Sequence, residues 1–177
     1  IAEQKSYGCY IREVADIQRC QFTASALADA AYGIYLAKKS EPINQSRVFD
    51  CEITANAAYN KSYGAYLEGG QNNYMFANDN ISSTAGCVTS HAVNLAKNST
   101  LEIVGCTLFA LPRMDTLGST TDSGVRGVMA GSESNLTMNR CNVYGEAQNP
   151  QAADKVYGLY LGGRCLIDST TIKAVSA

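Results

Sequence analysis

The sequence predicts an all-β solenoid, in which a unit of about 30 residues is repeated six times along the chain. Two observations support this prediction. Short segments alternate apolar and polar residues with a period of two, which is typical of strands, and no segment shows the sustained 3.6-residue period of a helix. Residues 101–110 (LEIVGCTLFA) form two such segments around a bend at Gly105-Cys106, and the same pattern recurs before and after them.

The second residue of that bend, Cys106, marks the anchor position of each repeat. An apolar residue precedes it by three positions, another follows it by two, and a small residue follows it by four. Successive anchors are 27 to 35 residues apart, so the pattern keeps its register while the connections vary in length. This is typical of a solenoid that confines insertions to its side loops. The six anchors are Cys20, Cys51, Asp79, Cys106, Cys141 and Thr170.

A second motif, Tyr-Gly-x-Tyr followed by Leu or Ile, lies upstream of the anchor. Alternation within it predicts that Ile34 and Leu36 point into the solenoid and that Tyr35 points outward. We expect the glycine either to leave a shallow trough beside the tyrosines or to supply a positive φ at a turn. The motif begins at Tyr7, Tyr32, Tyr63 and Tyr157, with degenerate copies at His91 and Arg126.

Residues 136–143 (LTMNRCNV) resemble the coil of a right-handed parallel β-helix. That family includes pectate lyases, polygalacturonases, phage tailspikes and adhesin passenger domains. The resemblance covers roughly Tyr7 to Ala174 and implies one domain over residues 1–177, with about six coils of three short strands. Many members stack asparagines at the bend between the second and third strands, where this chain carries mostly cysteine. Resembling enzymes bind polysaccharide on the first sheet.

Composition narrows the classes of function. The formal net charge is −2 and 17% of the residues are charged, with no basic patch, so nucleic acid is not an expected partner. No run of about 18 apolar residues predicts a membrane span. The chain shows no initiator Met, signal peptide or polar caps, so we expect a segment of a longer solenoid. β-helices of this type are mostly exported, which implies a secreted or cell-surface protein.

The cysteines offer little chemistry. Cys20 with Cys51, and Cys106 with Cys141, fall on adjacent coils, where stacked Cβ atoms would lie about 4.8 Å apart, slightly beyond the disulfide range. We expect free, buried thiols, although the oxidation state stays open. A metal site from Cys20, Cys51 and Asp79 would lack Cys-x-x-Cys spacing, so no metal or cofactor is predicted. Asp79 is interpreted as a bend residue in place of Asn rather than as a catalytic acid.

The tyrosines are the main candidates for ligand binding, because aromatic faces along a trough can stack on sugar rings. The alternative is that they only stabilise the sheet through cross-strand contacts. Catalysis has weaker candidates: His91 lies one coil before Arg126, as a lyase base beside an arginine would, and Glu68 is the only acid near the tyrosines. Acid–base glycosidases need two carboxylates, so no catalytic residue is predicted. The predicted ligand-binding residues are Tyr10, Tyr35, Tyr66 and Tyr160.

Three functions therefore remain open. The first is a non-catalytic extracellular segment, a stalk or binding module of a surface adhesin or fibre, which contacts polysaccharide or a host or surface protein. Its contacts would come from the tyrosines or from the longest connectors, 37–45, 111–125 and 146–156, which we expect on one edge. The second is a polysaccharide lyase or glycoside hydrolase acting on the first sheet. The third is a structural filament whose ends stack head to tail.

Overall fold

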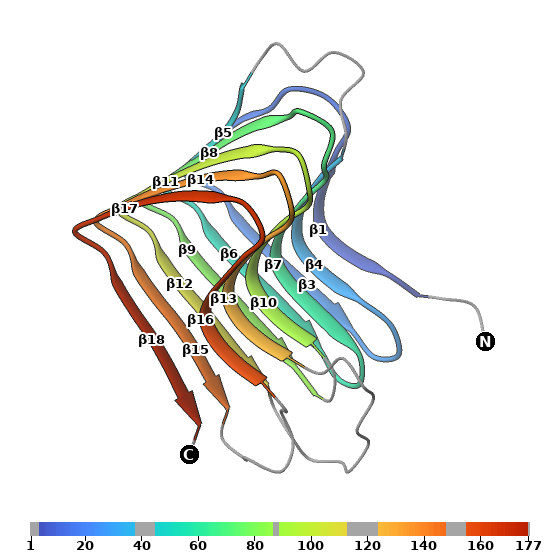
Figure 1. Cartoon of the computed structure of the whole chain (residues 1–177). Helices are drawn as coiled ribbons and strands as arrows, with labels where there is room; N and C mark the ends of the chain where they lie inside the picture. Colours follow the sequence, from blue (N-terminus) through green and yellow to red (C-terminus); the bar gives the residue numbers. More distant parts are fainter. Residues whose placement is uncertain (1–3, 38–44, 87–88, 113–123, 148–154, 177) are drawn as a thin grey trace.

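The computed structural model describes residues 4–37, 45–86, 89–112, 124–147 and 155–176, which form a three-sided β-solenoid (Figure 1). Each coil contributes one strand to each of three six-stranded parallel sheets, called A, B and C here. Eighteen strands and no helix lie in the described ranges, which confirms the predicted solenoid. Within these ranges no helix is therefore long and apolar enough to cross a membrane.

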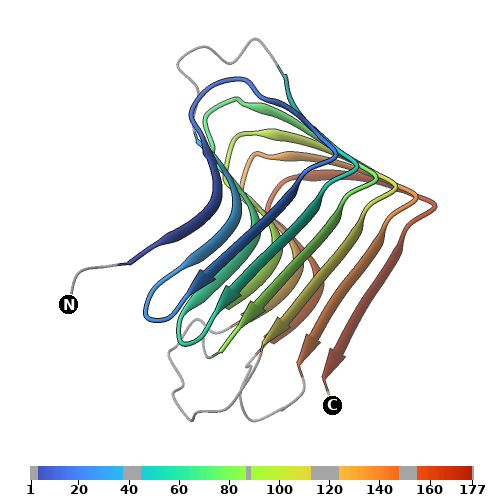
Figure 2. The same cartoon turned by 180° about the vertical axis from the view of Figure 1, so that it is seen from behind.

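The strands of each sheet follow one another from coil to coil, and those of sheet C lie side by side in Figure 2. Sheet A contains β1 (Ser6–Ile11), β4 (Ala31–Leu36), β7 (Lys61–Leu67), β10 (Thr89–Leu95), β13 (Gly124–Ala130) and β16 (Lys155–Leu161). Sheet B contains β2 (Asp16–Gln18), β5 (Gln45–Phe49), β8 (Asn73–Ala77), β11 (Thr100–Val104), β14 (Asn135–Asn139) and β17 (Arg164–Asp168). Sheet C contains β3 (Gln21–Ala26), β6 (Glu52–Ala57), β9 (Asn80–Ala85), β12 (Thr107–Pro112), β15 (Asn142–Ala147) and β18 (Thr171–Ser176).

The core is built from rows of like residues stacked in register. In sheet C, Ile53 pairs with Ile81, Ile81 with Leu108, and Leu108 with Val143. None of these four is more than 1% exposed. Burying each such side chain contributes about 1.5–3 kcal/mol, so the rows hold the coils together. The two rows predicted to face inward in sheet A are likewise buried in the inner coils: Ile34, Ala65, Val93, Val128 and Leu36, Leu67, Leu95, Ala130.

Each bend from sheet B to sheet C uses one residue in the left-handed backbone conformation. The residue directly before the anchor has φ between 48° and 66° in all six coils. In the first five coils its amide donates to a carbonyl of the next coil, as from Asn78 to Val104 O at 2.9 Å. Only one coil uses glycine there, although other residues adopt this conformation at a cost. The six residues are Arg19, Asp50, Asn78, Gly105, Arg140 and Ser169.

The anchors form a side-chain ladder immediately after this bend. The Cys51 amide donates to Asp79 Oδ1 at 2.7 Å, and the Asp79 amide donates to Cys106 Sγ at 3.3 Å. The Cys20 amide meets Cys51 Sγ at 3.5 Å, and the Cys141 amide donates to Thr170 Oγ1 at 3.2 Å. Asp79 therefore accepts a backbone hydrogen bond at the bend, as predicted for a residue in place of Asn. The six described cysteines are free thiols, while Cys87 lies outside the described residues.

The long connectors do not leave from one edge, contrary to expectation. Most of their residues lie outside the described ranges, but the strands they join are placed. The first connector joins β4 of sheet A to β5 of sheet B, whereas the other two join sheet C to sheet A. The lengths of the connectors do not show which two sheets each connector joins.

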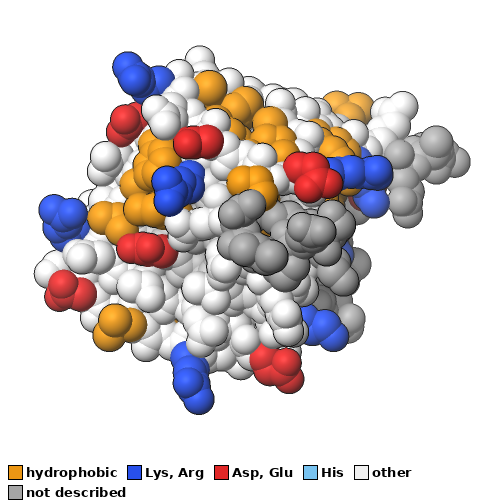
Figure 3. Space-filling view, turned by 90° about the horizontal axis from the view of Figure 1, so that it is seen from above, with side chains coloured by type: hydrophobic (Ala, Val, Ile, Leu, Met, Phe, Trp, Pro, Cys, Tyr) orange, Lys and Arg blue, Asp and Glu red, His pale blue; other side chains and the backbone are white. Residues whose placement is uncertain are grey.

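On the face seen from above, charges of both signs are interspersed, with no basic patch there (Figure 3).

Candidate ligand-binding face

Two columns of aromatic rings run along the outer face of sheet A. The first column begins with Tyr7, Tyr32 and Tyr63, and the second with Tyr10, Tyr35 and Tyr66. Neighbouring rings within a column lie 5.0–5.3 Å apart between centroids, with interplanar angles of 11–22°. Rings of the two columns meet edge to face, at 5.2 Å for Tyr32 and Tyr35. Such contacts add stability beyond the buried area.

The glycine of the motif explains why both tyrosines of a strand share one face. Strict alternation would put Tyr32 and Tyr35 on opposite faces, but Gly33 and Ile34 both face the interior and the regular pairing skips Gly33. A Cβ on Gly33 would lie 2.6 Å from the Cγ2 atom of Ile53, because sheet C packs directly beneath. Among the described glycines, only Gly70 and Gly105 have positive φ. Close backbone approach is thus the reason for the motif glycine, and the predicted positive φ is wrong.

Because the rings within each column stack on one another, most of their faces are not open to a ligand. Each inner ring has its faces covered by its column neighbours, and the other column fills the space over the glycine. The predicted trough with open ring faces is therefore wrong. Ring edges remain available, most of all at the ends, where Tyr10 is 45% and Tyr160 42% exposed. Tyr63 is buried, at 9%.

Other residues replace the tyrosines of both columns in β10 and β13. His91 stands in the first column and makes an edge contact with Tyr63, with ring centroids 5.3 Å apart. Its Nδ1 lies 3.0 Å from Asn94 Oδ1 in the second column, and Arg126 Nη1 donates to its Nε2 at 2.7 Å. His91 therefore carries its proton on Nδ1. Burial, and then the neighbouring Arg126 charge, lower the pKa of His91 to about 3, so the imidazole is neutral.

The structure brings together two of the three weak catalytic candidates. His91 and Arg126 are register partners in direct contact, as their spacing predicts. Glu68 lies beyond the second column, directly after the end of β7 and five residues after Tyr63, the partner of His91. That is roughly 16 Å along the strand. Glu68 Oε1 accepts a hydrogen bond from the Tyr35 hydroxyl instead. His91 is 3% exposed with both ring nitrogens engaged, so it presents no free base to a ligand.

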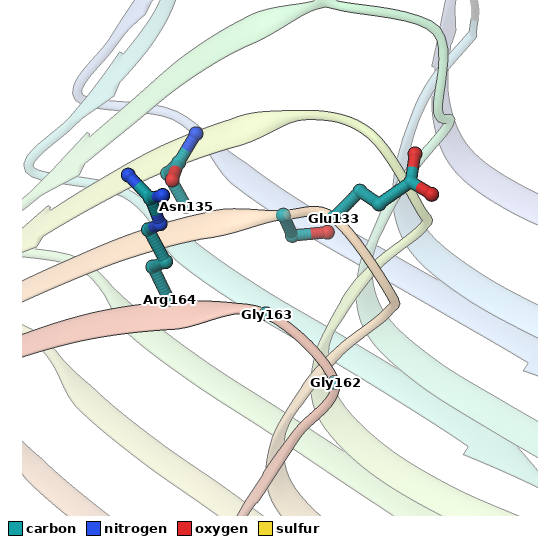
Figure 4. Close-up of a pocket in the computed structure, with 6 residues that line it drawn as sticks. Glu133, Asn135, Gly162, Gly163 and Arg164 are labelled. Atoms are coloured by element: carbon teal, nitrogen blue, oxygen red, sulfur yellow. The ribbon is translucent and has the colours of Figure 1, made fainter.

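A shallow hollow lies elsewhere, at the corner between sheets A and B in the last two coils (Figure 4). Asn135 and Arg164 are register partners on β14 and β17 and lie near one another, while the Glu133 carboxylate points away from them. The hollow contains none of the residues predicted from sequence. Its lining residues are Glu133, Ser134, Asn135, Gly162, Gly163 and Arg164.

The three parallel sheets define this chain as a parallel β-helix, and the family that it matches places it in the pectin-lyase-like class. More specifically, residues 3–161 match the family described as NosD, periplasmic copper-binding protein, and the chain belongs to that family. No curated protein and no solved structure gives a significant match. The family is described by copper binding and by the periplasm, not by an enzymatic activity or by adhesion.

Proposed function

We propose that this chain is a non-catalytic binding module of a protein that works outside the cytoplasm, and that the outer face of sheet A binds polysaccharide. The observation that carries the proposal is the pair of tyrosine columns, which are partly exposed on a face whose described residues include no catalytic acid pair. A glycan strand along the solenoid axis would meet tyrosine ring edges at β1, β4, β7 and β16, and His91, Asn94, Arg126 and Met129 in the two coils between β7 and β16. The periplasmic description of the family supports a location outside the cytoplasm.

A lyase or hydrolase on this face has less support. Glu68 is hydrogen-bonded to Tyr35 and lies far along the strand from His91, so these two described candidates are not placed as acid and base around one bond. The family description names no enzyme. Surface-protein binding by the same face is the alternative outcome of the binding screen below.

The family description names copper, but the described residues of this chain do not fit a copper site. Copper sites use His, Cys and Met in close groups. Among the described residues no three His, Cys, Asp or Glu side chains gather at one point. Both nitrogens of His91 are occupied beside a cation, and burial raises the pKa of the Cys51 and Cys106 thiols, which favours their protonated form. We infer that these residues bind no copper.

The glycan proposal is tested with a polysaccharide panel, read by calorimetry for binding and by reducing-end assay for product. Tyr10→Ala and Tyr160→Ala should weaken binding about tenfold each, with no product from any variant. Tyr59→Ala is the matched control, because Tyr59 is 57% exposed and makes no ring contact with either column among the described residues. Product release that His91→Ala abolishes would refute the non-catalytic assignment. Equal loss in the Tyr59 control would refute the role of the columns.

Copper binding is tested by titrating the chain with Cu(I) and Cu(II) and measuring retained metal after desalting. We expect less than one equivalent. Stoichiometric binding that is lost when Cys51 and Cys106 are changed to Ser would contradict the inference. Head-to-tail stacking stays a prediction, which sedimentation velocity over a concentration series would test.

A further inference from the structure

Arg126 occupies an unusual position within the aromatic face. Its guanidinium lies over the rings of Tyr160 and Tyr157, with Cζ at 5.2 and 5.9 Å from their centroids. The absence of a side chain at Gly124 makes room for it, because a Cβ there would lie 3.2 Å from the guanidinium atoms. Arg126 is thus packed against two tyrosine rings, at a column position where four of the six coils carry tyrosine and β10 carries His91.

The hydrogen bonding of this guanidinium is incomplete. Nη1 donates to His91 Nε2, but Nε is buried and has no hydrogen-bond partner. A buried donor without a partner costs about 1–3 kcal/mol, and such a group calls for an acceptor. The unmet donor is the feature that distinguishes this arginine from an ordinary surface cation.

The positive charge is also uncompensated among the described side chains. The hydrogen-bond partner of Arg126 is the neutral His91, and no described carboxylate forms an ion pair with Arg126. Lys61 adds a second positive charge, since it also lowers the pKa of His91. In the row Lys61, Thr89, Gly124, Lys155, Lys155 lies one coil after Gly124 and Lys61 two coils before it. Both lysines are exposed, so they add positive charge to the part of the outer face that contains Arg126.

We propose that Arg126, with Lys155 on the next coil and Lys61 near His91, forms a carboxylate-binding site for an acidic glycan. A guanidinium donates hydrogen bonds to a planar carboxylate, two in parallel where both donors are free, and lysines attract the carboxylate as point charges. The inference rests on the proposed glycan-binding face and adds the ligand class: a uronate-bearing polymer, with one carboxylate at Arg126 and neighbouring sugars along the tyrosine columns.

An acidic peptide is disfavoured by the same geometry. Peptides bind sheets by adding a strand to a free edge, or by filling pockets with alternate side chains. Strand β13 is paired on both sides, with β10 and β16, so it offers no edge. The rings beside it are in mutual contact, with Tyr157 and Tyr160 5.3 Å apart, which leaves no side-chain pocket between them. A polymer that lies across the face needs neither feature.

The experiment measures the affinity of the full chain for a uronate oligosaccharide and for its carboxyl-reduced, neutral form. Arg126→Gln should weaken acidic binding by tenfold or more and leave neutral binding unchanged, because only the charged hydrogen bonds are lost. Arg126→Lys should fall between, since it keeps the charge without the fork. Arg164→Gln is the matched control at the corner between sheets A and B. The Nε–Hε resonance of Arg126 should shift when the uronate binds, a readout that altered stability would not produce.

The outcomes separate this inference from the proposed function. Equal affinity for both oligosaccharides, or no effect of Arg126→Gln, would overturn the carboxylate site while the tyrosine face stands. Tyr10→Ala weakens neutral binding only if the face itself binds glycan, so its failure counts against the proposed function. Binding of a poly-glutamate peptide that depends on Arg126, without uronate binding, would overturn the glycan assignment. If Arg126→Gln fails to fold, the Arg126→Lys affinity and the resonance shift decide.

Discussion

Replacing Asp79 by Asn should stabilise the protein, and the gain should depend on pH. Asp79 is fully buried, and burial raises its pKa from the ordinary 3.8 to about 7, opposed by backbone hydrogen bonds. Because the native pKa exceeds the unfolded one, folding binds a proton, and the unfolding free energy falls as the pH rises from about 4 to about 7. At about 1.4 kcal/mol per pH unit, this interval corresponds to about 4 kcal/mol at most.

Asn keeps the oxygen that accepts from the Cys51 amide and cannot ionise. We therefore expect Asp79→Asn to raise the unfolding free energy by about 2–4 kcal/mol at pH 8 and to change it little near pH 4. Urea unfolding followed by circular dichroism from pH 4 to 8.5 measures the difference. Asp16→Asn removes an exposed carboxylate and should show no such trend. A gain that does not vary with pH, or a loss of stability at pH 8, would refute the reasoning.

Three further predictions concern packing and thiol chemistry. Gly64→Ala should destabilise by about 1–3 kcal/mol in thermal unfolding, because its Cβ would lie 2.5 Å from the Cγ2 atom of Ile81; unchanged stability would contradict the close approach. Leu108→Ala should cost about 2–5 kcal/mol in urea unfolding, whereas Leu27→Ala, at a side chain 75% exposed, should cost almost nothing. Maleimide labelling of the native protein should spare Cys106, whose pKa burial raises, and fast labelling there would argue against a buried thiol.

The fold was predictable from sequence because the solenoid repeats its own chemistry. Each coil contacts only its neighbours, so residues that stack in space recur at fixed positions, and the row of Ile53, Ile81 and Leu108 is visible as a pattern. The residues that bend the chain gave no such signal. Asp50 and Asn78 adopt the left-handed conformation as Gly105 does. Because these three residues differ in type, their shared backbone geometry is not visible as a repeated residue in the sequence.

The candidate face was predictable in position but not in shape. The motif tyrosines were placed on the first sheet, yet alternation could not reveal that Tyr32 and Tyr35 share one side. That depends on two consecutive interior residues, Gly33 and Ile34, which break the period of two. Ring stacking follows from the pairing of coils, so the covered ring faces became clear only once the register was known. The neutral state of His91 likewise depends on its depth of burial.

Departures from the repeat have two different meanings in this chain. Asp79 replaces cysteine in the anchor row, yet it still accepts the backbone amide that the row requires, so it serves the fold. Arg126 replaces tyrosine in the first column and leaves a buried donor without a partner and a charge without a described counter-ion. A substitution that completes the hydrogen bonds of its row is explained by structure alone. One that leaves them incomplete calls for something outside the chain, which is why the search for a ligand begins at Arg126.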